Sequence, residues 1–322
     1  MCIHTKEGAD MNEIITLEAN TSIQNTGISE SMFYKWLSFI DASEKTQATY
    51  TRAIKQFYLY LQAEGISNPT REDVLTYKEK LSADHKPATI NLYLQAIKLF
   101  FRWTAEQGLY PNIAEHIKGA KLAKGFKKDN LTSTQAKSVL SGIDTNTLHG
   151  ARDYAIIALM MTTGLRTIEV ERANIGDMRT MGDSTVLYVQ GKGHTDKDAY
   201  VKIPRTVEAA IWEYLTFRGK AEDTEPLFAS ISHRNGGGRM TTRSISRLVK
   251  EAMIDAGYNS DRLTAHSLRH TAATLNLLNG GTPEETMQLL RHANLNTTLI
   301  YSHALERANN NSEYRIADAI FA

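Results

Sequence analysis

The sequence predicts a mainly helical protein that carries a small β-hairpin and divides into two domains. Apolar residues recur at helical spacing along most of the chain, which favours amphipathic helices. Two β-rich runs, 185–190 and 199–203, flank a glycine-containing loop, which is typical of a hairpin. The 322 residues exceed the usual size of one domain, and a hydrophobic content of 42% suffices for two cores.

Four helices are predicted in the first domain, residues 30–115, after a leader of residues 1–29 that is expected to be mobile. The predicted apolar faces lie within residues 33–40, 50–61, 74–81 and 90–101. Thr70 and Asp73 form a capping pair at the start of the third helix, and Gly108 follows the fourth. Short links between these segments indicate a compact helical bundle.

Basic residues are concentrated in the first domain and in the segment that follows it. Residues 30–128 carry fifteen bases and ten acids, whereas residues 129–322 are nearly neutral. Residues 116–130, which are rich in lysine, predict a flexible linker between the domains. The candidate contacts to a phosphate backbone are Arg52, Lys55, Lys98, Arg102, Lys121 and Lys124. A solvated surface without a ligand is the alternative interpretation of the same charges.

The second domain, residues 131–322, is predicted to be mixed α/β. Its helical patterns cover residues 134–140, 151–163, 166–172, 207–217, 242–256, 266–278 and 284–290. The β-hairpin falls between the third and fourth of these segments. A last helix is predicted near residues 305–322, because Ile316, Ile320 and Phe321 share one face of it.

Six polar residues of the second domain suit phosphoryl transfer when they are taken together. They are Arg166, Lys192, His266, Arg269, His292 and Tyr301. A phosphodiester that is attacked at phosphorus gains negative charge on its oxygens, and guanidinium groups donate paired, charged hydrogen bonds to such oxygens. No carboxylates cluster with these residues in the sequence, so we expect the arginines to take the place of metal ions.

Two of the six residues suit covalent chemistry. The Tyr301 phenol, with an ordinary pKa of about 10, ionises more readily than an alkyl alcohol and can act as a nucleophile. Lys192, on the hairpin loop, can protonate a departing 5′ oxygen. An aryl phosphodiester would retain the energy of the broken bond, so neither ATP nor another cofactor is expected.

The order of these residues, with their flanking motifs, resembles the tyrosine recombinase (phage integrase) family, and most closely its Xer-like two-domain members. The motifs are Thr-Gly-Leu-Arg at Arg166, Gly-Lys-Gly at Lys192, His-Ser-Leu-Arg-His at 266–270, Leu-Leu-Arg-His at 289–292 and Ile-Tyr-Ser-His at 300–303. The likeness covers roughly residues 30–322. It implies a SAM-like core-binding domain and a catalytic domain that together clamp duplex DNA.

The resemblance also implies a role for the phosphate-binding residues. Arg166 and Arg269 would bind the scissile phosphate, and His266 and His292 would support them. Glu169 matches an acidic position that buttresses the site.

For the remaining residues, the resemblance implies that Tyr301 is the nucleophile and Lys192 the general acid, whereas Tyr314 is too far from His292 to match. The intermediate would be a 3′-phosphotyrosine, and a Holliday junction would form within a homotetramer on inverted-repeat core sites. In such a tetramer the helix near residues 305–322 would dock into a neighbouring protomer.

Two features depart from the family pattern. Many relatives have Leu-Gly-His where this chain has Leu-Arg-His, so Arg291 is expected either to contact DNA or to face solvent. The leader of 29 residues is too short for the arm-site-binding domain of larger phage integrases, which favours a simple recombinase.

The predicted biological role is integration and excision of a mobile element, with an accessory excisionase as an optional partner. Xer-type resolution of chromosome or plasmid dimers is the second alternative, and a type IB topoisomerase the third. A catalytically silent DNA-binding regulator and a zinc hydrolase represent other classes. His266 and His270 have a spacing that can bind zinc, but position 267 is Ser where a Glu general base is expected. His270 is therefore interpreted as a packed or phosphate-facing neighbour.

Composition excludes several further classes. No stretch approaches the ~18 apolar residues of a membrane span. The first twenty residues lack the apolar core of a secretory signal. The single cysteine, Cys2, cannot form an internal disulfide and suits a reducing compartment. A cytoplasmic, nucleoid-associated protein is therefore expected.

Overall fold

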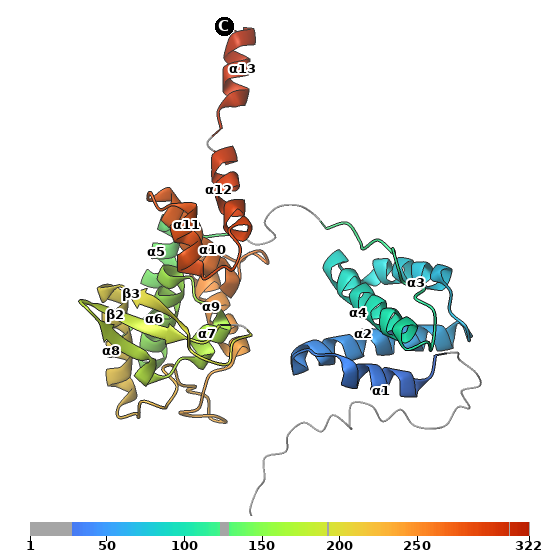
Figure 1. Ribbon diagram of the computed structural model, residues 1–322. Helices are drawn as coiled ribbons and strands as arrows, with labels where there is room; N and C mark the ends of the chain where they lie inside the picture. Colours follow the sequence, from blue (N-terminus) through green and yellow to red (C-terminus); the bar gives the residue numbers. More distant parts are fainter. Residues whose placement is uncertain (1–27, 123–128, 192, 309, 322) are drawn as a thin grey trace, which may run out of the picture. The chain divides into compact units, whose positions relative to one another are not determined.

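The computed structural model describes residues 28–122, 129–191, 193–308 and 310–321. The chain divides into two compact units, Met1–Lys124 (unit 1) and Gly125–Ala322 (unit 2) (Figure 1). The leader predicted for residues 1–29 lies outside the described residues, apart from Ile28 and Ser29. Ile28 is fully buried in the core of unit 1.

Unit 1 is the predicted four-helix bundle. Its helices are α1 (Glu30–Phe39), α2 (Glu44–Ala63), α3 (Arg71–Asp84) and α4 (Pro87–Glu106). Asp73 accepts a hydrogen bond from the Thr70 backbone N–H at 2.7 Å, so the predicted capping pair opens α3. Its core is aromatic: Trp36, Phe57 and Phe100 are almost completely buried, and each buried side chain of this size contributes about 1.5–3 kcal/mol.

The start of the predicted flexible linker belongs to unit 1, which corrects the prediction for residues 116–121. The Asn91 side chain, on α4, donates to the Ala120 carbonyl at 3.0 Å and accepts from the Ala120 N–H at 2.6 Å. Ile117 is buried in the core. These contacts hold the segment against the bundle, because a paired backbone and a buried apolar side chain oppose its release.

Unit 2 combines a three-stranded sheet with helices. Its helices are α5 (Ser133–Ser141), α6 (Leu148–Thr163), α7 (Thr167–Arg172), the 3₁₀ helix η1 (Ile175–Asp177), α8 (Arg205–Arg218), α9 (Thr242–Asp255), α10 (Ala265–Leu278), α11 (Pro283–Leu290), α12 (Asn296–Ala308) and α13 (Ser312–Phe321). Helix α6 is apolar on all sides from Ala155 to Met161 and packs against α8, α10 and β3 (Ala199–Ile203), so it lies at the centre of the core.

The sheet contains the predicted hairpin and one strand that the sequence pattern does not predict. Strand β2 (Ser184–Val189) pairs antiparallel with β3, with Thr185 opposite Ile203. Strand β1 (Met178–Met181) pairs antiparallel with the other edge of β2 (Figure 1).

The C-terminal segment forms two helices where one was predicted near residues 305–322. Helix α12 ends at Ala308 and α13 begins at Ser312, whose N–H donates to the Asn310 side chain at 2.8 Å. None of the described residues of α13 is buried, and its apolar side chains Ile316 and Ile320 are exposed. Across the described residues, no helix has both the length and the apolar character of a membrane span.

Candidate active site

Unit 2 brings five of the six predicted catalytic residues into one electrostatically coupled group, in which the charges of neighbouring members act on the pKa of Arg269, His292 and Tyr301. The five are Arg166, His266, Arg269, His292 and Tyr301. They come from α10, from α12 and from the residues that flank α7, α11 and α12. The sixth, Lys192, lies outside the described residues, so its position relative to this group remains a prediction.

A glycine turn positions Arg166. Gly164 ends α6 with φ of 61°, and a β-carbon at this residue would come within 2.5 Å of the Leu290 side chain. The turn therefore requires glycine both for its backbone conformation and for its packing. Two residues later, Arg166 is the N-cap residue of α7, and its side chain is 32% exposed. A guanidinium that is held at a helix start and still reaches solvent can contact a phosphate.

Glu169 is buried, with 1% of its side chain exposed, and it binds two arginines. One carboxylate oxygen accepts from the Arg166 backbone N–H at 2.7 Å and from Arg291 Nη2 at 2.9 Å. The other accepts from Arg166 Nη1 at 3.1 Å. Charge-assisted hydrogen bonds on both oxygens stabilise a carboxylate that is excluded from water. Glu169 thereby restricts the orientation of the Arg166 side chain.

Arg291 is part of this buried cluster, with 14% of its side chain exposed, so the alternative that it simply faces solvent was wrong, whereas a contact with DNA stays a prediction. Its backbone is left-handed, with φ of 53°, and it caps the end of α11. Its Nη1 donates to the Leu289 carbonyl at 2.8 Å, while Nη2 pairs with Glu169. Glycine is favoured in this backbone conformation, so the ion pair offsets the conformational cost of an arginine.

Arg269 connects three parts of unit 2. It is 2% exposed on α10, and its guanidinium donates to the Gly164 carbonyl at 2.5 Å and to the Leu290 carbonyl. Burial, together with the like charges of Arg166 and Arg291, lowers the pKa of Arg269 to about 9, so it is still charged at neutral pH. A guanidinium has five N–H donors, so these two bonds leave capacity for an anion.

The two predicted histidines lie beside the arginines. His266 is exposed near the start of α10, and the His292 ring is held by a 2.8 Å hydrogen bond between its Nδ1 and the Thr298 hydroxyl. Burial, followed by the charges of Arg269 and Arg166, lowers the pKa of His292 to about 4. A neutral imidazole that is anchored through one nitrogen can present the other to a phosphate oxygen.

Tyr301 contacts a residue to which the sequence assigned no catalytic role. Tyr301 lies on α12, is 5% exposed, and packs with Ala273 and Leu290. Its phenolic oxygen is 2.6 Å from His270 Nδ1. Burial raises the pKa of Tyr301 to about 12, although Arg269 and Arg166 oppose this shift. His270 is therefore a neighbour of the phenol. The sequence interpretation of His270 as a packed or phosphate-facing residue named no such partner.

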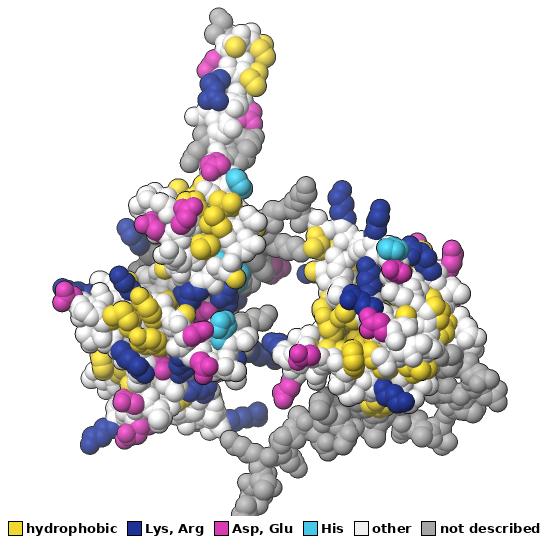
Figure 2. All heavy atoms as spheres, viewed as in Figure 1, with side chains coloured by type: hydrophobic (Ala, Val, Ile, Leu, Met, Phe, Trp, Pro, Cys, Tyr) yellow, Lys and Arg dark blue, Asp and Glu magenta, His cyan; other side chains and the backbone are white. Residues whose placement is uncertain are grey.

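The candidate DNA contacts of unit 1 lie on the bundle surface. Arg52, Arg102 and Lys121 are exposed, and Lys55 and Lys98 are half-buried; Lys124 lies outside the described residues. Figure 2 shows lysine and arginine side chains over unit 1, interspersed with hydrophobic and acidic ones. This distribution is compatible with phosphate contacts and with a solvated surface alike.

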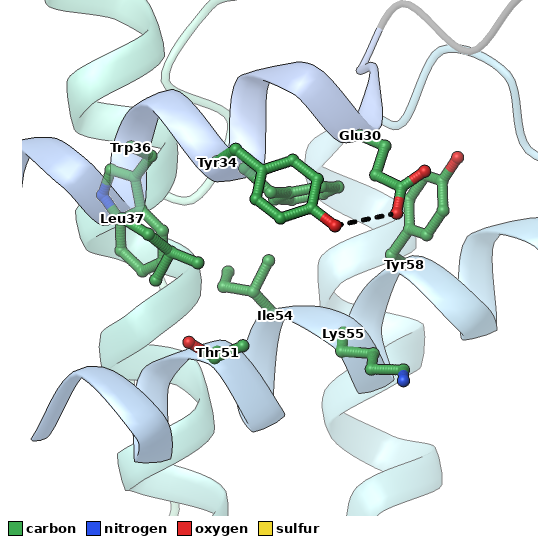
Figure 3. Close-up of a pocket in the computed structure, with 9 residues that line it drawn as sticks. Glu30, Tyr34, Trp36, Leu37, Thr51, Ile54, Lys55 and Tyr58 are labelled. Carbon is green, nitrogen blue, oxygen red and sulfur yellow. Dashed lines mark hydrogen bonds between the residues drawn. The ribbon is translucent and has the colours of Figure 1, made fainter. Parts of the chain in front are cut away.

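Lys55 also borders a small hollow between α1 and α2 (Figure 3). The cavity volume is about 50 Å³, and mostly apolar side chains line it, including Trp36, Leu37 and Ile54. Tyr34 donates to Glu30 at 3.5 Å at its rim. The hollow lies outside the group of residues around Tyr301, since it belongs to unit 1.

Two family descriptions match the chain. The phage integrase family matches residues 129–307, and the N-terminal SAM-like domain of phage integrases matches residues 31–109. The chain belongs to the phage integrase family. It is thus a tyrosine recombinase, an enzyme that cleaves and rejoins DNA through a tyrosine.

Similar proteins agree with this membership. A tyrosine recombinase of Synechocystis sp. is 32% identical over 80% of this chain and 86% of the relative. Tyrosine recombinase XerA of Pyrococcus horikoshii is 31% identical over 89% of this chain and 92% of the relative.

Among solved structures, the XerH recombinase in its post-cleavage complex with a palindromic difH substrate has a TM-score of 0.69 at 22% identity, covering 91% of this chain and 84% of that one. A lambda integrase tetramer bound to a Holliday junction has a TM-score of 0.66 at 16% identity, covering 84% of this chain and 76% of that one. These likenesses establish the shared fold.

Two half-buried histidines of this recombinase predict a loss of stability in mild acid. Burial and neighbouring positive charges lower the pKa of both His270 and His292 to about 4, whereas an unfolded histidine titrates near 6.5. Between these values the unfolded chain binds more protons, so stability falls as pH decreases from about 6.5 to 4.

We expect this loss to be about 2 kcal/mol in total, because both rings are only half-buried and solvent screens the effect. Thermal unfolding of unit 2 at several pH values measures it. The variant His292→Asn should show a shallower decline than the wild type, and an equal decline would contradict the assignment.

Proposed function

We propose that this chain is a site-specific DNA recombinase in which Tyr301 attacks the scissile phosphate and forms a 3′-phosphotyrosine intermediate. The observation that supports it most directly is that Tyr301, Arg166, Arg269 and His292 share one electrostatically coupled group in unit 2. A phosphodiester bound to these arginines would lie near the phenolic oxygen. The permanent positive charge of the arginines would stabilise the charge that develops on the phosphate oxygens.

The proposed roles follow from chemistry and exposure. Arg166 and Arg269 bind the two non-bridging oxygens, and His266 and His292 donate further hydrogen bonds to them. Lys192 protonates the departing 5′ oxygen, which is a poor leaving group without a proton. The scheme requires no metal ion, cofactor or ATP.

The decisive experiment traps the covalent intermediate. The DNA site is first selected from a randomised inverted-repeat library by its binding to this protein. The full chain is then mixed with a duplex that carries this site and a nick near the scissile phosphate. After cleavage the short end beside the nick diffuses away, so the strands cannot be rejoined. We expect a protein–DNA adduct that persists in denaturant and in EDTA, because the bond is covalent and the arginines supply the charge. Mass spectrometry should locate the nucleotide on Tyr301.

A matched tyrosine provides the control. Tyr301→Phe should abolish the adduct, whereas Tyr314→Phe should leave it unchanged, because Tyr314 is 72% exposed on α13. A nucleotide found on any other residue, or an adduct that EDTA prevents, would refute the proposal. A catalytically silent DNA-binding regulator would bind the same duplex without forming any adduct.

The proposed biological role is integration and excision of a mobile element, and an accessory excisionase is an optional partner. Xer-type dimer resolution is a second candidate, because XerA and XerC proteins are among the relatives at 31–32% identity. The two roles differ in their DNA. A mobile element predicts recombination between the ends of a circularised element, whereas dimer resolution predicts recombination between two identical chromosomal or plasmid sites.

We further propose that the recombinase acts as a homotetramer on duplex DNA with inverted-repeat sites, and that α13 docks on a neighbouring protomer. Lambda integrase, whose structure has been solved as a tetramer bound to a Holliday junction, shares the fold of this chain. The exposed apolar face of α13 supports such docking, since burial of large apolar side chains favours association.

The double substitution Ile316→Asp/Ile320→Asp tests this docking. We expect the variant to lose tetramer assembly on DNA, measured by mass photometry, while its circular dichroism is unchanged, because both side chains are exposed. Asp318→Asn, on the opposite face of α13, is the control and should assemble normally. Normal assembly of the double variant would contradict the docking proposal.

A further inference from the structure

The phenolic oxygen of Tyr301 has a close basic neighbour that lies outside the six predicted catalytic residues. His270 lies on α10, one helical turn after His266, and its Nδ1 is 2.6 Å from the Tyr301 oxygen. The two rings have centroids 5.3 Å apart. Because α10 packs against α12, the contact joins two packed helices. It therefore belongs to the internal structure of unit 2.

We propose that His270 is the catalytic base for Tyr301: it accepts the phenol proton during strand cleavage and returns it when the strands are rejoined. This proposal rests on the proposed function, because it requires Tyr301 to be the nucleophile. A distance of 2.6 Å is short enough for direct proton transfer without an intervening water.

Without DNA, the pair is in the protonation state from which this transfer starts. Burial, with the charges of His266 and Arg269, lowers the pKa of His270 to about 4, so its imidazole is neutral and can accept a proton at Nδ1. The raised pKa of Tyr301 keeps the proton on oxygen. Among the described residues, the charged and titratable groups that act on the pKa of one or the other member of the pair include His266, Arg269 and Arg166. A phosphodiester adds negative charge among these groups, which raises the proton affinity of His270.

The proton balance of the step is complete. In cleavage the Tyr301 O–H bond breaks, the proton bonds to His270 Nδ1, and the phenolic oxygen forms a bond to phosphorus. The P–O5′ bond breaks, and the 5′ oxygen takes a proton from the general acid proposed above, Lys192. In rejoining, the 5′ hydroxyl gives its proton back to Lys192 while its oxygen bonds to phosphorus, the bond between phosphorus and the phenolic oxygen breaks, and His270 returns its proton to the phenolic oxygen.

His266 and His292 are less suited to the same task. The His292 Nδ1 is engaged with the Thr298 hydroxyl, and His266 meets the edge of the His270 ring with centroids 4.7 Å apart. By contrast, the phenolic oxygen of Tyr301 is hydrogen-bonded to His270 Nδ1.

Single-turnover cleavage of the nicked duplex described above tests the base. His270→Asn places a carbonyl oxygen near the position of Nδ1, so it preserves an acceptor while removing the basic nitrogen. We expect this variant to cleave about 100-fold more slowly. His303→Asn is the matched control, because His303 lies on α12 in an exposed pair with Glu306, and it should cleave at the wild-type rate. A His270→Asn variant that cleaves at the wild-type rate would overturn the proposal.

Two chemical substitutions separate a base from a residue that only positions the phenol. A fluorotyrosine at position 301 has a more acidic phenol, so it should restore most of the rate of His270→Asn. A duplex with sulfur in place of the bridging 5′ oxygen needs no general acid, so it should rescue Lys192→Ala but leave His270→Asn slow. Absence of rescue by fluorotyrosine would assign His270 a purely structural role and overturn the proposal. If Tyr301→Phe still forms the adduct, the proposed function fails as well, so the two failures are distinguishable.

Discussion

Replacing Arg166 by alanine is expected to slow strand cleavage by about 10³-fold, while binding of the duplex changes by less than about tenfold. A single arginine that stabilises a phosphoryl transition state contributes about 10³–10⁵ in rate. Arg166 is suited to this role, because Glu169 fixes its guanidinium and its side chain still reaches solvent. Binding depends on many phosphate contacts, so the loss of one charge affects it less.

Two further variants sharpen this test. Arg166→Lys keeps the charge but loses the planar fork, so it should recover only part of the rate. Arg205→Ala removes an exposed arginine at the start of α8 and should cleave normally. Single-turnover adduct formation and gel-shift titration provide the two measurements. Equal losses of cleavage and binding in Arg166→Ala would show that the residue only binds DNA.

Replacing Arg291 by alanine is expected to destabilise unit 2 by about 3 kcal/mol. Glu169 is 1% exposed and would lose one of its two arginine partners, which leaves a buried carboxylate incompletely paired. Arg291→Gly should cost about 1 kcal/mol less than Arg291→Ala, because its φ of 53° favours glycine. Urea unfolding of the two variants measures the difference.

A double-mutant cycle with Glu169→Gln isolates the ion pair. If Arg291 acts through Glu169, the effects of Arg291→Ala and Glu169→Gln should be non-additive by at least about 1 kcal/mol. Additive effects would show that Arg291 stabilises α11 independently of Glu169. Cleavage should fall together with stability in both variants, because Glu169 also restricts Arg166.

The helices of this protein can be predicted from sequence because their apolar residues repeat at helical spacing. The second bundle helix, expected around residues 50–61, corresponds to α2 at Glu44–Ala63, and the difference lies in polar turns that carry no apolar signal. Strand β1 is only four residues long and mostly exposed, so alternation could not reveal it. The Gly182-Asp183 pair between β1 and β2 was the available signal, because such dipeptides favour tight hairpin turns.

The residues of the candidate site divide in the same way. Arg166, Arg269 and Tyr301 can be proposed from their order in recognisable motifs. The partners of Arg291 and Tyr301 could not be predicted from sequence, because they depend on contacts between distant segments. Glu169 is 122 residues from Arg291, and His270 is 31 residues from Tyr301. Sequence spacing on one helix cannot reveal a hydrogen bond to another helix.

The placement of Arg269 affects how stalled complexes of this enzyme should be prepared for crystallography. Its guanidinium donates hydrogen bonds to the carbonyls at the ends of α6 and α11, in addition to any contact with substrate. A variant inactivated by replacing Arg269 would therefore also leave the Gly164 and Leu290 carbonyls without these hydrogen bonds. Such a variant would be less stable and prone to unfold during purification. Tyr301→Phe removes one oxygen atom and keeps the Arg269 hydrogen bonds, so it is the better variant for crystallising the complex with uncleaved DNA.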